Sequence, residues 1–236
     1  MPRMKQLALD IGLATGPTLS RFFAGPNEAA LQHLRLAAGV GSSNPASRSP
    51  VPTYIWGESG SGKSHLLNAV RQTLREQGDA VGWLDPSVGE PPEFDEAWSA
   101  VLMDDVHLYS TAQQAMAFNW FVNAISPASG SQRWVLAAGD LPPADLPLRD
   151  DLRSRLGWGH VFQLQLLGEP ERRAVLRQEA DARGVFLSDD VMDYMLNRFS
   201  RDLGSLMQLL DQLDAYALRA QRAITIPLLK AMLESE

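Results

Sequence analysis

The sequence predicts an α/β fold, in which a parallel five-stranded sheet is followed by a small C-terminal helical subdomain. Two observations carry this prediction. Short apolar runs typical of strands alternate with helical patterns as far as about residue 167, which favours a mainly parallel sheet covered by helices on both faces. From Glu169 onward apolar residues recur only at helical spacing, so this part is expected to be all-helical.

Each element is justified by its local pattern. The expected strands are short apolar runs bounded by turn residues, and they cover residues 53–56, 80–84, 100–103, 133–138 and 160–166. Helical patterns cover residues 27–38, 63–77 and 112–125, and three or four more helices follow residue 169. The Gly-, Ser- and Pro-rich stretch 39–52 is a loop. We divide the chain into an extended tail (1–20), an α/β core (21–167) and a helical lid (168–236).

Composition excludes several classes of protein. The 236 residues are 45% hydrophobic, which is enough for a sizeable core. A net charge of -7 is unfavourable for a protein that binds the phosphate backbone of nucleic acids, so no direct sequence-specific DNA binding is expected. Cysteine is absent, which excludes disulfides and fits a reducing compartment. No apolar run reaches the roughly 18–20 residues of a membrane span, so we expect a cytoplasmic protein.

The strongest chemical signal is YIWGESGSGKSHLL, which lies between an expected strand and an expected helix and fits G-x-x-x-x-G-K-[ST]. In such a loop, backbone N–H groups turn toward phosphate oxygens, the lysine reaches the terminal phosphates and the serine binds Mg²⁺. A glycine-rich turn with an exposed lysine is the alternative, and it fits this setting poorly. We expect ADP or ATP with Mg²⁺ at Gly57, Gly60, Gly62, Lys63, Ser64 and His65.

An acidic pair directly follows the strand expected at residues 100–103. A P-loop site needs a carboxylate at the end of a neighbouring strand to handle the magnesium ion. We expect Asp104 to hold the metal together with Ser64, and Asp105 to polarise an attacking water. Taken alone, such a pair is as typical of a helix cap or a solvated turn.

Three further stretches resemble the AAA+ family, most closely the bacterial replication initiators of the DnaA type. RFFAGPNEAAL is similar to the family's adenine-side segment, which implies contacts from Phe23 and Asn27 on either side of Gly25. VLAAGDLPPADL resembles the fourth-strand motif, which implies that Asp140 lies near the γ-phosphate. DLRSRLGWG resembles S-R-[FL]-x-W-G, which implies that Arg155 is an arginine finger for a neighbour's nucleotide. Without the flanking GWG, a surface salt bridge would be the preferred interpretation.

The resemblance fails in two places. Gly204 stands where the family has a lid arginine, with Arg201 three residues upstream as a candidate substitute. The sequence ends at Glu236, directly after the lid, so we expect the AAA+ module alone, without the initiators' DNA-reading domain.

The tail contains QLALDIG, which begins at Gln6. A signal peptide does not fit, because Asp10 interrupts a short apolar run. The alternation of Leu7, Leu9 and Ile11 also suits an edge strand. In front of an AAA+ core, this tail resembles the Hda family, regulatory inactivators homologous to DnaA whose N-terminal segment binds the beta-subunit sliding clamp of DNA polymerase. An extended peptide of this kind inserts its apolar side chains into a partner's pocket.

The resemblance implies a regulator of replication initiation that binds ATP or ADP, docks on the clamp and stimulates ATP hydrolysis by DnaA. Whether it hydrolyses ATP itself or forms a homo-oligomer is left open. Two alternatives remain: a helicase loader or transposition ATPase of the DnaC/IstB type, which needs a basic and aromatic path for single-stranded DNA, and a small-molecule P-loop kinase. The four histidines show no metal-ligand spacing among themselves, so no zinc site is expected.

Overall fold

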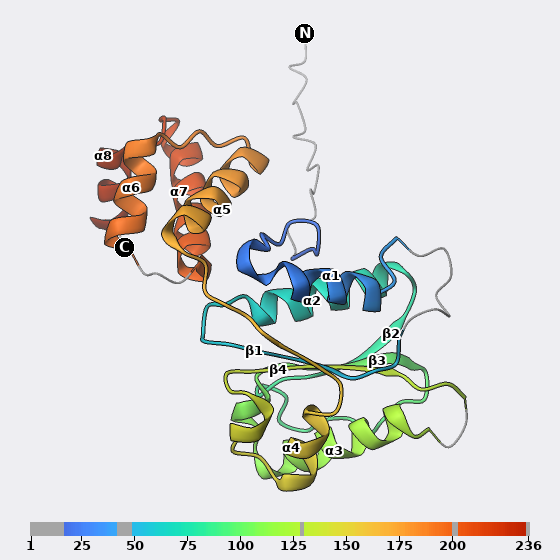
Figure 1. The fold of residues 1–236 in the computed structure, drawn as a ribbon. Coiled ribbons are helices and arrows are strands. Elements are labelled where there is room, and N and C mark those ends of the chain that lie inside the picture. Colours follow the sequence, from blue (N-terminus) through green and yellow to red (C-terminus); the bar gives the residue numbers. More distant parts are fainter. Residues whose placement is uncertain (1–16, 42–48, 128–129, 200–202, 235–236) are drawn as a thin grey trace.

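The computed structural model describes residues 17–41, 49–127, 130–199 and 203–234, which form an α/β core and a bundle of lid helices (Figure 1). The predicted clamp-binding residues and Arg201 lie outside the described residues. Among the helices that are described, none is both long and apolar enough to cross a membrane.

The core is built on a five-stranded sheet whose paired strands are all parallel, as predicted. The strands are β1 (Thr53–Trp56), β2 (Ala80–Leu84), β3 (Trp98–Met103), β4 (Trp134–Gly139) and β5 (His160–Gln163), in the order β2-β3-β4-β1-β5. Since these strands are parallel, the carboxyl ends of β1, β3 and β4 meet at one edge. Ligands bind at this edge in open α/β sheets.

Helices cover both faces of the sheet (Figure 1). On one face lie α1 (Glu28–Ala37) and α2 (Lys63–Glu76), and on the other lie α3 (Thr111–Ile125) and α4 (Asp150–Leu156). Each face has its own apolar core, with Leu66 and Leu67 on the α2 side and Trp120 and Phe121 on the α3 side, all four nearly inaccessible to solvent. Burial on both faces explains why the strand sequences are continuous apolar runs.

The structure differs from the sequence prediction at several boundaries. β3 begins at Trp98, two residues earlier than expected, and α4 was not predicted because a single seven-residue helix shows too few turns for a periodicity. β5 ends at Gln163 instead of residue 166. The residues after it form the connection to the lid, and Gln165 there is hydrogen-bonded to the Asn27 side chain.

The lid consists of α5 (Glu169–Ala182), α6 (Asp189–Arg198), α7 (Leu203–Ala220) and α8 (Ile226–Glu234). Its helices enclose a separate apolar core that includes Met192, Met195, Leu206, Leu210 and Leu213. In Figure 1 this bundle lies on the same side of the sheet as α1 and α2. The prediction of a C-terminal helical lid is therefore confirmed.

Candidate nucleotide-binding site

A cleft of about 670 Å³ lies between the loop after β1, the segment before α1 and the lid. Its lining includes the P-loop from Ser59 to His65, Asp105 and Asp140 from the sheet edge, and Gly204 and Met207 from α7. The predicted phosphate-binding residues other than Gly57 thus line one cleft, together with Phe23 and Asn27. Arg155 is not among the residues that line it.

The P-loop conformation depends on glycine at two described positions. Gly60 and Gly62 have φ angles of 83° and 96°, a left-handed region that side-chain-bearing residues rarely adopt. A Cβ on Gly62 would also lie 2.9 Å from the Phe22 ring. Gly62 caps α2, so the first N–H groups of this helix and its positive dipole end face the cleft, an arrangement that favours a bound anion.

Lys63 is the buried cation of the site, with 5% of its side chain exposed. Its ammonium donates to the carbonyl oxygens of Gly57 at 2.8 Å and Glu58 at 3.1 Å, and lies 2.7 Å from the Asp140 Oδ1 atom. Lysine therefore bridges its own loop and the end of β4. This contact brings Asp140 to the P-loop lysine; its predicted position beside the terminal phosphates and its catalytic role both stay predictions.

Asp104 and Ser64 lie together where a magnesium ion is predicted. Burial raises the pKa of the Asp104 carboxyl to about 6, and the nearby Asp105 charge adds to this, whereas a hydrogen bond with the Ser64 side chain opposes it. A buried carboxylate beside the hydroxyl of Ser64, which lines the cleft, is a suitable donor set for a hard cation, although Asp104 itself is not among the lining residues. These residues fit Mg²⁺, which would neutralise the charge that burial disfavours.

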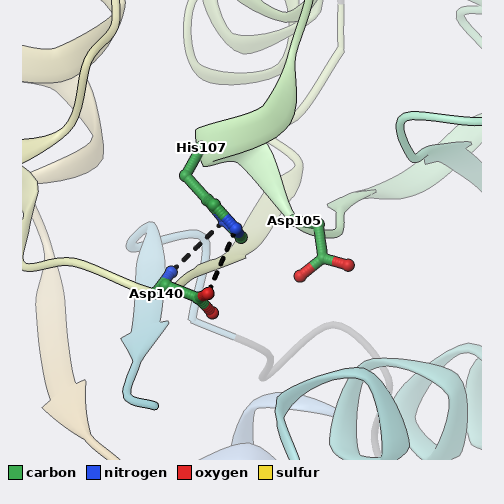
Figure 2. Close-up of side chains that lie close together, drawn as sticks. All are labelled: Asp105, His107 and Asp140. Carbon is green, nitrogen blue, oxygen red and sulfur yellow. Dashed lines mark hydrogen bonds and ion pairs between the residues drawn. The ribbon is translucent and has the colours of Figure 1, made fainter. Parts of the chain in front are cut away.

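Asp105, His107 and Asp140 form a group at the sheet edge (Figure 2). The His107 Nδ1 atom accepts the Asp140 backbone N–H at 3.3 Å, and Nε2 lies 3.2 Å from the Asp140 Oδ2 atom. Both contacts are favourable in the neutral tautomer that carries its proton on Nε2. Asp105 has a left-handed backbone with φ of 46°, and its carboxylate makes no hydrogen bond or ion pair in the described part of the chain.

The apolar end of the cleft is formed by Phe22, Phe23, Leu167, Val175 and Met207. Phe22 packs against the His65 ring, with ring centroids 5.7 Å apart. The Asn27 amide is engaged with Gln165: it donates to the Gln165 carbonyl at 2.9 Å and accepts the Gln165 N–H at 2.7 Å. The adenine contact of Asn27 stays a prediction. In the structure this side chain joins the segment before α1 to the connection between the core and the lid.

Sequence reasoning missed many residues of the cleft, among them Phe22, Ser61 and Arg183. The Ser61 hydroxyl is buried without a partner among the described residues, and its place inside the P-loop motif could have drawn attention to it. Arg183 comes from the end of α5 and is paired with Asp211 at 2.5 Å. No motif marks Arg183, because its position depends on how the lid packs.

Arg155 lies on α4, which covers the α3 face of the sheet (Figure 1). Its guanidinium lies 4.5 Å from the Phe118 ring centroid and 5.2 Å from that of Trp158, and it donates to the Asp151 carbonyl at 3.0 Å. Aromatic contacts of this kind hold an arginine without neutralising it. Trp158 beside it is 63% exposed, so this region is an apolar and cationic surface.

The fold is that of an AAA+ module, an α/β core with a P-loop sequence followed by a helical lid. Residues 169–233 match the family model described as "Hda, lid domain". Domain III of the Thermotoga maritima replication initiation protein DnaA aligns with a TM-score of 0.73 and 20% identity, over 92% of this chain and 95% of that one. These findings confirm the predicted resemblance to Hda- and DnaA-like AAA+ proteins.

Other solved structures share the fold. AMPPCP-bound DnaA from Aquifex aeolicus aligns with a TM-score of 0.60 and 21% identity, over 82% of this chain and 64% of that one. The Thermotoga maritima RuvB branch migration motor aligns with a TM-score of 0.61 and 15% identity, over 88% of this chain and 68% of that one. At such identities the likeness establishes the fold alone.

Proposed function

We propose that this chain is a regulator of DNA replication initiation that binds ADP or ATP, docks on the DNA polymerase sliding clamp and stimulates ATP hydrolysis by the initiator DnaA. The lid match to Hda and the fold shared with domain III of DnaA support the choice of process and partner. The observation that carries the mechanism is the position of Arg155 outside its own nucleotide cleft.

The proposed nucleotide lies along the cleft, with its phosphates at the P-loop and its base at the apolar end. Lys63 and the N–H groups at the start of α2 hold the phosphates, and Ser64 and Asp104 hold Mg²⁺. The magnesium ion, when bound, screens phosphate charge and fixes the phosphate geometry. Two similar structures are DnaA proteins bound to AMPPCP, which supports the choice of ligand.

Arg155 serves a neighbouring molecule in this proposal. Its guanidinium is half-buried against Phe118 and Trp158, keeps its charge and lies on a different face from the lid. An arginine held in this way can reach the nucleotide of a second AAA+ module that packs against α4. There it stabilises negative charge as the phosphoryl group is transferred, an effect that in other systems supplies roughly 10³–10⁵ in rate, or about 4–7 kcal/mol.

The clamp contact is assigned to Gln6, Leu7, Leu9 and Ile11, which lie outside the described residues. Its support is the sequence pattern, a polar anchor followed by alternating apolar side chains. Docking on a DNA-loaded clamp would concentrate the chain at DNA that carries the clamp. Binding in two places, clamp and initiator, then raises the effective concentration of Arg155 at its target.

The test mixes the purified chain with ATP-loaded DnaA and DNA-loaded clamp and measures phosphate release. Arg155→Ala should abolish the stimulation while the chain's own nucleotide affinity stays within about twofold. Arg153→Ala is the matched control, because Arg153 lies on the same helix, paired with Asp150 at 2.6 Å, and should retain stimulation. If Arg155→Ala instead weakens the chain's own nucleotide binding, the arginine acts in cis and the proposed mechanism is wrong.

A further inference from the structure

The Lys63 ammonium is held inside the protein by two hydrogen bonds and one ion pair. It donates to Gly57 O at 2.8 Å and Glu58 O at 3.1 Å, and the Asp140 Oδ1 atom lies 2.7 Å from it as its anionic partner. An ammonium group has three N–H bonds and no acceptor capacity. A phosphate oxygen that approaches Lys63 therefore competes with these partners.

Asp140 is the partner that differs from the other two. The carbonyls belong to the loop that Lys63 itself holds together, whereas Asp140 comes from the end of β4, lines the cleft and is 37% exposed. Its oxygen is an anionic acceptor at a charge-assisted distance, as a phosphate oxygen would be. We propose that Asp140 is an internal substitute for phosphate, which caps Lys63 in the nucleotide-free protein and competes with the incoming phosphate.

His107 keeps Asp140 in this position (Figure 2). The imidazole contacts Asp140 twice, through the backbone N–H at 3.3 Å and through Oδ2 at 3.2 Å, while the other carboxylate oxygen, Oδ1, contacts Lys63. The following residue is fixed as well, because the Tyr54 hydroxyl donates to the Leu141 carbonyl at 2.7 Å. His107 is thus a positioning residue that holds the Asp140 carboxylate beside Lys63.

The charges around Asp140 oppose the separation of its carboxylate from Lys63. When a phosphate binds Lys63, the Asp140 carboxylate loses its ion pair with that lysine. A second carboxylate, that of Asp105, lies within 4.8 Å and has no ion-pair partner in the described residues. Like charges at this distance repel strongly in a partly buried site. The cost of separating Lys63 from Asp140 is therefore subtracted from the binding free energy of any phosphate ligand, and the affinity of the cleft is set partly by Asp140.

The inference rests on the proposed nucleotide binding and is tested on the full, nucleotide-free chain by calorimetric titration with MgADP. Asp140→Asn keeps the shape of the side chain and removes its charge, so we expect MgADP to bind about tenfold more tightly, the difference between a charge-assisted and a neutral hydrogen bond. Asp145→Asn removes the same charge from an exposed residue outside the cleft and should change the affinity less than about twofold. His107→Gln should give a smaller increase than Asp140→Asn.

A second readout is thermal melting without nucleotide, in which Asp140→Asn should melt lower than the wild type because Lys63 loses its charged partner. Unchanged or weaker MgADP binding by Asp140→Asn, with Asp145→Asn also unchanged, would overturn the inference. It would indicate that Asp140 merely contacts the ligand. If the wild-type chain does not bind MgADP at all, the proposed function fails instead. A poorly folded Asp140→Asn leaves His107→Gln as the deciding variant, and no increase in its affinity would also refute the competition.

Discussion

Asn27→Ala is expected to lower the free energy of unfolding of the α/β core by about 2–3 kcal/mol. The Asn27 side chain is buried, with 3% exposed, and its amide pairs with both backbone groups of Gln165, at 2.9 Å and 2.7 Å. The two residues are 138 positions apart in sequence. These bonds therefore fasten the start of α1 to the connection between the core and the lid.

The magnitude follows from what the alanine variant leaves behind. The N–H and C=O groups of Gln165 each lose a partner, which costs roughly 1–3 kcal/mol per buried group. Both bonds are only partly buried, so water replaces part of each, and we take about 1–1.5 kcal/mol per bond. For a chain of this size each kcal/mol shifts the melting temperature by about 2–4 °C, which gives a decrease of about 4–12 °C.

The assay is thermal melting of the nucleotide-free chain, followed by circular dichroism. Asn27→Asp should also be destabilised, because it keeps the acceptor for the Gln165 N–H but turns an oxygen toward the Gln165 carbonyl. Asn123→Ala is the matched control: its amide bonds only within α3, so its unfolding free energy should change by less than about 0.5 kcal/mol. An Asn27→Ala variant that melts like the wild type but binds nucleotide more weakly would refute the reasoning and favour the adenine contact.

Three further predictions concern the phosphate site, the tail and acid stability. Lys63→Ala should weaken fluorescent ADP binding about 10–100-fold, because a charge-assisted contact to phosphate is lost; unchanged affinity would exclude the P-loop assignment. Leu9→Ala combined with Ile11→Ala should weaken clamp binding by about two orders of magnitude or more without lowering the melting temperature, whereas an edge-strand role predicts lower stability. Burial, reinforced by His160, lowers the pKa of His33 below its ordinary 6.5, so the unfolded chain binds more protons and stability falls as the pH drops through this region. Urea unfolding at pH 7.5 and 5.5 should show a smaller acid loss for His33→Gln than for the wild type, and an equal loss would contradict this.

The sequence by itself determined the parts of the protein that rest on local pattern. Hydrophobic runs and helical spacing predicted the five strands and the helical lid, and GESGSGKS predicted the phosphate-binding loop, because glycine conformation and residue spacing are properties of a short segment. The acidic pair at Asp104 and Asp105 was found in the same way, from its place directly after a strand.

Only the tertiary structure decided which distant groups meet. The contact between Lys63 and Asp140 requires β1 and β4 to be neighbours. The pairing of Asn27 with Gln165 requires the segment after β5 to lie beside the segment before α1. The lining of the cleft by Arg183 depends likewise on the packing of α5 against α7. These contacts leave no periodic signal in one sequence, because burial and charge pairing act between surfaces that the fold brings together and not between neighbours along the chain.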